Sequence, residues 1–257
     1  MPLPYFEAPS VEIGPIVLRP FPVLMSAGIL TAHLIMVRRA RRLGLDTGRM
    51  GDLSLTMVVV GLVGAGAFKF LYHLEVLRLD WWTIVTKHLA IASLGGILGG
   101  LLGAVLFFRW THMSPDRAWR FIDVAAFAFP FGWIFGRTAC AVVHDHPGLR
   151  SDSWLAVAYP GGARYDLGLI EVLYFIPMIG VFLWLDRQEK PAGFFLALFL
   201  CLYGPFRIAL DQLHVDPPRY FGIPVDTWTG CLIAAAGTLI MARRVLTDRF
   251  LVHGGDQ

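Results

Sequence analysis

Seven long runs of apolar residues, separated by short polar segments, make up most of this chain. The runs cover about residues 20–37, 53–73, 88–108, 121–143, 166–185, 192–212 and 225–242. A helix of about 20 apolar residues crosses the hydrocarbon core of a bilayer. The pattern therefore predicts an all-α, polytopic integral membrane protein with seven transmembrane helices, folded as a single domain over residues 1–257.

The composition excludes several other classes of protein. Of the 257 residues, 56% are hydrophobic and 16% are charged, whereas soluble domains carry about 25% charged residues. This shortage of charge excludes a soluble enzyme and a disordered chain. The formal net charge of +3 is too small to indicate a polyanionic partner. We therefore expect the lipid bilayer as the surroundings of the protein and no nucleic acid as its partner.

Basic residues are distributed unevenly among the polar segments. They gather after the first, third, fifth and seventh runs, at Arg38, Arg39, Arg41, Arg42, Arg49, Arg109, Arg117, Arg120, Arg187, Lys190, Arg243, Arg244 and Arg249. Because positively charged loops stay in the cytoplasm, this pattern predicts an N-terminus outside and a C-terminus in the cytoplasm. The segments at about residues 74–87, 144–165 and 213–224 then face outward.

The third run is rich in glycine. It contains Gly95, Gly96, Gly99, Gly100 and Gly103. Small residues at such spacing let the backbone of another helix approach closely. We therefore expect this helix to pack tightly against a neighbour.

Three polar residues interrupt the sixth run at helical spacing. Tyr203, Arg207 and Asp211 lie four residues apart, which places them on one face of a helix. Asp211 can pair with Arg207 and leave other guanidinium donors free for an anion. A purely structural ion pair is the alternative interpretation. A charge inside the bilayer is costly, so either reading requires a partner or a function.

A second arginine lies near the outer end of the fourth run. Arg137 follows Gly136, which leaves room around the guanidinium. The planar guanidinium binds two phosphate oxygens at once. Arg137 and Arg207, on different helices and both in the outward half, would form a positively charged pocket suited to a lipid phosphate. Alternatively, Arg137 extends to the outer headgroups.

Other polar residues offer weaker indications. Glu171, at the start of the fifth run, is a candidate acidic member of the same cavity. His144 and His146 flank Asp145 in an outward loop, and such a pair could bind a metal. The spacing suggests no third ligand, so we expect neither a metal nor a cofactor.

Taken together, these segments resemble the prolipoprotein diacylglyceryl transferase family over about residues 12–245. Arg137 stands at the arginine of the family signature, Cys140 at its asparagine and Asp145 at its closing glutamate. Tyr203, Arg207 and Asp211 look like the motif Y-G-x-x-R-x-x-x-E, with aspartate in place of glutamate, and Glu171 matches the glutamate of another motif. The family's S-F-H-G-G-L-x-G motif corresponds to residues 92–99, with Leu94 at the catalytic histidine.

The resemblance implies an enzyme of the bacterial inner membrane, with its active site toward the outer leaflet. It would move a diacylglyceryl group from phosphatidylglycerol, or another anionic phospholipid, to the cysteine thiol of a lipoprotein precursor. Arg137 and Arg207 would stabilise the leaving phosphate. His144, His73 or His88 could supply the base, and Asp145 could orient a histidine. The implied substrate-binding residues are Arg137, Arg207, Tyr203, Asp211, Cys140 and Glu171.

Two other functions remain open at this point. A catalytically inactive member of the same fold would bind lipid or lipoprotein through the arginine pocket without turnover. A transporter or small channel is the third class, although the sequence lacks the inverted half-repeats that are typical of transporters.

Overall fold

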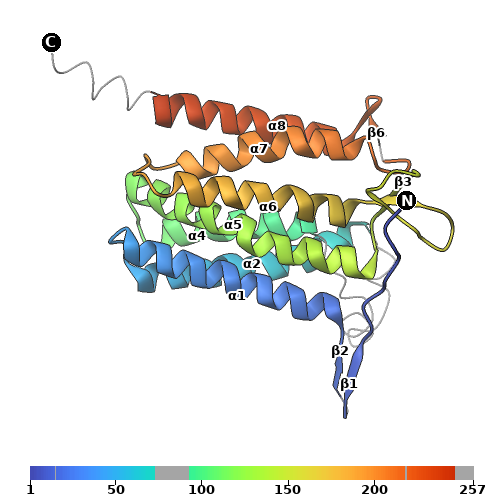
Figure 1. Ribbon diagram of the computed structural model, residues 1–257. Coiled ribbons are helices and arrows are strands. Elements are labelled where there is room, and N and C mark those ends of the chain that lie inside the picture. Colours follow the sequence, from blue (N-terminus) through green and yellow to red (C-terminus); the bar gives the residue numbers. More distant parts are fainter. Residues whose placement is uncertain (15, 73–92, 218, 247–257) are drawn as a thin grey trace. The chain divides into compact units, whose positions relative to one another are not determined.

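Seven helices carry most of the chain in the computed structural model, which describes residues 1–14, 16–72, 93–217 and 219–246 (Figure 1). They are α1 (Pro20–Arg42), α2 (Thr47–Tyr72), α4 (Ser93–Trp110), α5 (Pro115–Val143), α6 (Leu167–Leu185), α7 (Phe194–Asp211) and α8 (Val225–Ile240), which continues into a π-helical turn at Met241–Leu246. Each predicted run forms one of these helices. The beginning of the third run, residues 88–92, lies outside the described residues.

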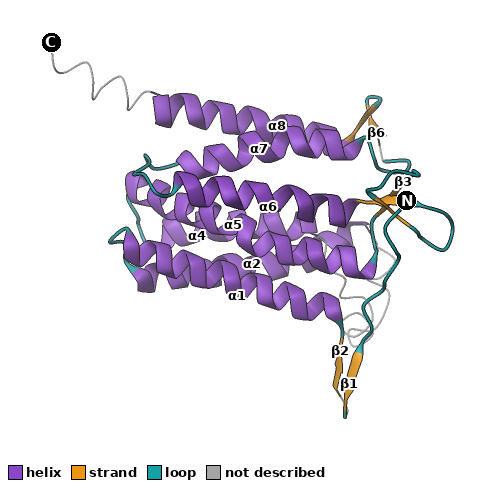
Figure 2. Ribbon diagram, viewed as in Figure 1, coloured by secondary structure: helices purple, strands orange, loops and turns teal. Residues whose placement is uncertain are grey.

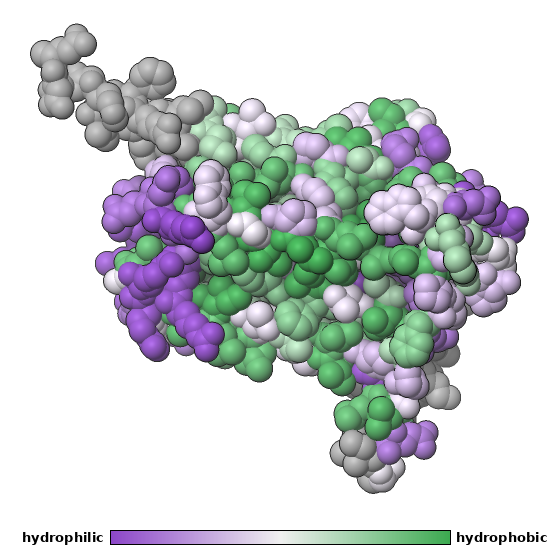
Figure 3. Space-filling view, in the orientation of Figure 1, coloured by the Kyte–Doolittle hydropathy of each residue, from purple (hydrophilic) through white to green (hydrophobic). Residues whose placement is uncertain are grey.

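Six of these helices are long and apolar enough to cross a membrane, and the seventh, α4, has a shorter apolar stretch at Leu94–Trp110. Hydrophobic side chains cover the middle of α6, α7 and α8 on the face drawn in Figure 3. Helices suit this setting because they satisfy their own backbone hydrogen bonds in lipid. The prediction of a mostly helical, polytopic membrane protein is confirmed.

Short strands lie in three polar segments outside the helices, a feature that the all-α prediction did not include (Figure 2). Strands β1 (Val11–Ile13) and β2 (Ile16–Leu18) form a hairpin before α1. Strands β3 (Pro147–Arg150), β5 (Arg164–Asp166) and β4 (Ala156–Val157) form an antiparallel sheet between α5 and α6. Strands β6 (Arg219–Tyr220) and β7 (Ile223–Pro224) form a second hairpin before α8.

The chain divides into two compact units. One comprises residues 35–122 and contains α2 and α4, which pack through glycine. A Cβ on Gly99 would lie 2.5 Å from the carbonyl oxygen of Val60, and a Cβ on Gly64 would lie 2.6 Å from that of Gly95. Real Cβ atoms do not approach so closely, so the two backbones meet only because these positions are glycine. The expected close packing of the glycine-rich helix is confirmed.

The other unit comprises residues 1–34 and 123–257. Aromatic rings fill part of its core, where Phe195 lies 4.9 Å from Phe127 and 5.3 Å from Phe182 between ring centroids. Helices α7 and α8 meet at Gly204 and Gly230, since a Cβ on either would lie 2.8 Å from the carbonyl oxygen of the other. This close packing brings the polar residues of α7 next to the beginning of α8.

The N-terminal segment lies along the outer sheet of the same unit (Figure 1). The backbone of Leu3 donates a hydrogen bond to Ala156 at 2.7 Å and accepts one from Ala158 at 2.9 Å. The amide of Ala8 donates to the carbonyl of Val142, at the end of α5, at 3.1 Å. These bonds fix residues 3–8 over the ends of α5 and α6.

Candidate active site

A buried carboxylate lies at the centre of the polar residues that α5, α6 and α7 contribute. The side chain of Glu171, on α6, is 1% exposed and forms an ion pair with the Nε of Arg137, on α5. The hydroxyl of Tyr203 donates a hydrogen bond to Oε1 of Glu171 at 2.9 Å. The Nη1 of Arg207 lies 3.7 Å from the same oxygen. The structure therefore brings four of the candidate residues together, with Glu171 as their common partner.

The two arginines are held differently. The guanidinium of Arg137 also stacks over the ring of Trp133, with Cζ 4.9 Å from the ring centroid. Arg207 forms a second ion pair, in which its Nη2 lies 2.6 Å from Oδ2 of Asp226, in the first turn of α8. Each guanidinium has five N–H donors in a rigid plane. Orientation by these partners therefore leaves further donors that an anion can use.

The expected ion pair between Asp211 and Arg207 is not among the contacts of the described residues. Asp211 instead accepts a hydrogen bond from the hydroxyl of Thr227 at 2.5 Å, and its Oδ1 lies 3.6 Å from Nδ1 of His214. The helical spacing relates residues on one helix only, whereas α8 supplies both Thr227 and Asp226. An acidic residue just inside the start of the last apolar run was the available signal for Asp226.

His144 joins the N-terminal segment to the beginning of α6. Its Nδ1 lies 2.6 Å from Oδ2 of Asp166, and its Nε2 lies 3.0 Å from the carbonyl oxygen of Phe6. The ring also stacks on Tyr5, with centroids 4.4 Å apart. Both ring nitrogens therefore lie against oxygen atoms of the protein itself. This geometry favours an anchoring role over that of a base.

Asp166 is the N-cap of α6 and accepts the amide of Leu169 at 2.9 Å. It also accepts a hydrogen bond from the hydroxyl of Tyr159 at 2.7 Å. Burial, followed by this hydrogen bond to a carboxylate, raises the pKa of Tyr159. Tyr159 therefore stays protonated and acts as a donor in this anchor.

The loop after α5 folds back on the helix. His144 has a positive φ of 52°, the left-handed conformation that commonly ends helices. The chain reversal brings Asp145 and His146 close to Cys140, and one donor atom from each of the three lies within 4.8 Å of the others. Asp145 contacts His146, with Oδ1 2.5 Å from Nδ1. The histidine that Asp145 contacts is therefore His146.

Two hydrogen-bond partners of His146 raise its pKa. Its hydrogen bond with Asp145, and then that with Cys140, raise the pKa of His146 to about 9. From sequence spacing alone, we expected no third metal ligand next to this loop.

The structure places Cys140, five residues before Asp145, beside Asp145 and His146, because the chain reverses between them.

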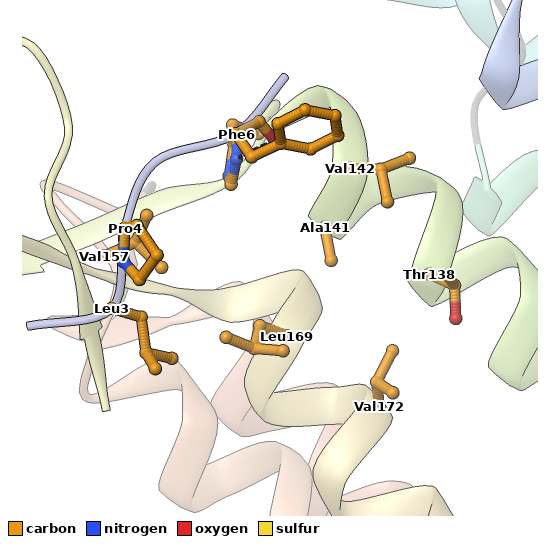
Figure 4. Close-up of a pocket in the computed structure, with 10 residues that line it drawn as sticks. Leu3, Pro4, Phe6, Thr138, Ala141, Val142, Val157, Leu169 and Val172 are labelled. Atoms are coloured by element: carbon orange, nitrogen blue, oxygen red, sulfur yellow. Dashed lines mark hydrogen bonds between the residues drawn. The ribbon is translucent and has the colours of Figure 1, made fainter. Parts of the chain in front are cut away.

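An apolar cavity of about 350 Å³ lies between the N-terminal segment and the helices α5 and α6 (Figure 4). Figure 4 shows side chains from three directions around it. The lining residues are Leu3, Pro4 and Phe6 of the N-terminal segment, Thr138, Ala141 and Val142 of α5, Leu169 and Val172 of α6, and His144 and Val157 of the outer segment. No sequence pattern indicated this cavity, because one of its walls comes from the chain's first residues.

Two sequence candidates for the base, His73 and His88, are outside the described residues. Leu94, at the position where the resemblance places a histidine, lies on α4 in the other unit and is 40% exposed. The described part of the chain therefore offers neither of these two histidines for comparison with His144 and His146.

Known proteins are similar to this chain over most of its length. Residues 9–243 match the sequence profile of a family described as "Prolipoprotein diacylglyceryl transferase". A relative from Leifsonia xyli subsp. xyli is 28% identical over 88% of this chain and 75% of its own length. Relatives from Symbiobacterium thermophilum (24% identical, 93% of each chain) and Chromohalobacter salexigens (27%, over 88% of this chain and 86% of the relative) also match. All three are named phosphatidylglycerol–prolipoprotein diacylglyceryl transferase.

Proposed function

Because this chain belongs to the prolipoprotein diacylglyceryl transferase family, we propose that it moves a diacylglyceryl group from phosphatidylglycerol to the cysteine thiol of a lipoprotein precursor. The observation that carries the proposal is the convergence of Arg137 and Arg207 on one buried carboxylate, Glu171. Two guanidinium groups held within one apolar unit are suited to an anionic phospholipid. The enzyme works in the bacterial plasma membrane, with this site toward the outer leaflet.

The chemistry places negative charge next to the arginines. The thiolate of the acceptor attacks the glyceryl carbon that carries the phosphate, so a C–S bond forms and the C–O bond breaks. The electron pair of that bond goes to the phosphate oxygen, and glycerol phosphate leaves. Arg137 and Arg207 stabilise this developing charge through charge-assisted hydrogen bonds. In a site with little water, such an arrangement is worth more than it would be in solution.

The carboxylates orient the arginines rather than react. Glu171 and Asp226 hold the guanidinium of Arg207 from two sides, and Glu171 holds Arg137. Tyr203 fixes Glu171 by its hydrogen bond. Asp211 accepts a hydrogen bond from Thr227 and so joins α7, the helix that carries Arg207, to α8. We assign all of these carboxylates, together with Tyr203, as positioning residues.

The apolar cavity supplies a place for hydrocarbon. Thr138 follows Arg137 on α5, and Val172 follows Glu171 on α6, so the cavity begins beside the arginine cluster. An acyl chain of the donor is the substrate part whose chemistry matches this lining. His144 then has a structural role, because it holds the N-terminal wall of the cavity in place.

The test is a transfer reaction with purified protein. The protein is incubated with phosphatidylglycerol and a peptide that contains the cysteine of a lipoprotein precursor, and the thioether-linked product is measured by mass spectrometry. We expect product with the natural chain and with Arg150→Ala, which removes an exposed arginine of the outer sheet. Arg137→Ala and Arg207→Ala should reduce the rate at least tenfold.

An inactive lipid-binding protein is the second candidate, favoured by Leu94 at the position of the family histidine. It predicts that phosphatidylglycerol binds in a manner that depends on Arg137 and Arg207, but that no product forms under any condition. That result would replace transfer with binding as the function.

A further inference from the structure

Thiol alkylation requires a thiolate, because a neutral thiol is a poor nucleophile. The proposed transfer therefore needs a group that removes the proton of the acceptor cysteine. Both nitrogens of His144 are engaged with acceptors. His146, the other histidine of this loop, is held by Asp145 next to Cys140.

We infer that Cys140, Asp145 and His146 bind a zinc ion, and that the open fourth position of this ion takes the acceptor thiol. The inference rests on the proposed function for the role of the zinc, but not for its binding. It departs from the expectation drawn from sequence spacing that no metal is bound. Sulfur, nitrogen and oxygen donors together are typical zinc ligands, and three protein ligands with an open position are typical of catalytic zinc.

The cluster can close around an ion with small movements. Donor atoms about 3.6 Å apart suit tetrahedral zinc, with bonds of about 2.0 Å to nitrogen or oxygen and about 2.3 Å to sulfur. The three donors now lie within 4.8 Å of one another. Cys140 is buried in the last turns of α5, whereas the side chains of Asp145 and His146 are 39% and 43% exposed. The two exposed side chains can therefore move while the cysteine stays in place.

The position of this cluster matches the chemistry. The backbone of α6 meets α5 at Gly168, where a Cβ would lie 3.0 Å from that of Cys140. One turn further along the same two helices, Arg137 and Glu171 form their ion pair. Three residues of helix correspond to about 4.5 Å along the axis. A thiolate on the zinc and a phosphate on the arginines would thus occupy adjacent levels of one site.

The step balances without any change of oxidation state. Binding to zinc releases the thiol proton to water and leaves a thiolate. The thiolate sulfur attacks the glyceryl carbon, the C–S bond forms, and the C–O bond breaks with its electron pair on the phosphate oxygen. Glycerol phosphate leaves as an anion beside Arg137 and Arg207. The neutral thioether is a weaker ligand than a thiolate, so the product dissociates and the zinc position opens again.

Metal binding is measured first, on the full chain in detergent. The protein is stripped with a chelator, reloaded with zinc, and its metal content is determined by mass spectrometry. We expect about one zinc ion per chain, with at least tenfold weaker binding in Cys140→Ala and in His146→Ala. Cys231→Ala removes an exposed cysteine on α8 and is the matched control, which should bind zinc as the natural chain does. Circular dichroism with the helical content of the natural chain shows that Cys140→Ala is folded.

Cobalt reports on the ligands directly. Cobalt-loaded protein should show thiolate-to-cobalt absorption in the natural chain and in Cys231→Ala, but not in Cys140→Ala. Addition of the precursor peptide should strengthen this absorption, whereas a peptide with serine in place of its cysteine should not. If the cysteine peptide does not change the cobalt spectrum, the acceptor thiol does not bind at the open position of the metal, and that part of the proposal is overturned.

The two proposals fail in different ways. Full transfer activity in a chain stripped of zinc, or equal zinc binding in folded Cys140→Ala, overturns the zinc site and leaves the transferase function intact. Zinc binding with a cysteine-dependent cobalt spectrum, but without any thioether product, supports the site and overturns the proposed function.

Discussion

Glutamine at position 171 tests the central carboxylate of the site. Glu171→Gln keeps the shape of the side chain and an oxygen for the hydroxyl of Tyr203, but it removes the charge on which Arg137 and Arg207 converge. The group is 1% exposed, so water cannot replace the lost partner. Breaking a buried pair by removing one partner costs about 3–5 kcal/mol. We expect a loss of stability in this range.

Asp226→Asn is the matched comparison. It removes the other carboxylate of Arg207, but this side chain is 32% exposed and water can solvate the arginine there. Ion pairs that remain open to solvent contribute about 1 kcal/mol or less. The free energy of unfolding, from denaturant titration in detergent, should therefore fall much more for Glu171→Gln than for Asp226→Asn.

The same variant has a kinetic consequence. Without Glu171 the two guanidinium groups lose their common orientation, so kcat for thioether formation should fall at least tenfold. Binding of phosphatidylglycerol should not weaken, since the site gains one net positive charge. If Glu171→Gln is as stable and as active as the natural chain, Glu171 does not hold the arginines and the reasoning is refuted.

Three other variants test separate parts of the site. Arg207→Lys should lower kcat at least tenfold, because one ammonium cannot match the planar contacts to Glu171 and Asp226; an unchanged rate would argue against them. Val172→Trp should fill the cavity and raise KM for phosphatidylglycerol with little change in zinc binding; equal KM values would place the acyl chain elsewhere. His144→Ala should speed amide exchange in residues 3–8, measured by mass spectrometry; continued protection would contradict its anchoring role.

The fold was largely predictable because lipid imposes simple requirements. A chain in a bilayer must satisfy its own backbone hydrogen bonds, so apolar runs of sufficient length become helices whatever their exact sequence. The glycines of α4 also carried local information, since only a residue without a Cβ permits the approach seen between Gly99 and Val60. The polar segments were less predictable, and each of their short sheets pairs strands within one segment.

The candidate site was predictable only in part. Arg137 and Arg207 were identifiable because a charge in an apolar run is costly and therefore informative. Glu171 was a candidate member of the same cavity, but its contacts with both arginines were not predictable, and Asp226 was not identified at all. Both carboxylates lie on other helices, so the packing of those helices decides whether they reach the arginines. Asp211 was assigned to Arg207 from spacing on one helix, while the structure gives it Thr227 across the interface.

The sequence by itself thus determined that this is a helical membrane protein with two arginines in its apolar runs, because those features depend on the cost of exposing polar groups to lipid. Only the tertiary structure decided what surrounds these arginines. The common carboxylate, the cavity under the N-terminal segment and the approach of Cys140 to His146 all arise from distant parts of the chain. Packing between helices and one chain reversal at His144 create them, and neither is encoded in a local pattern.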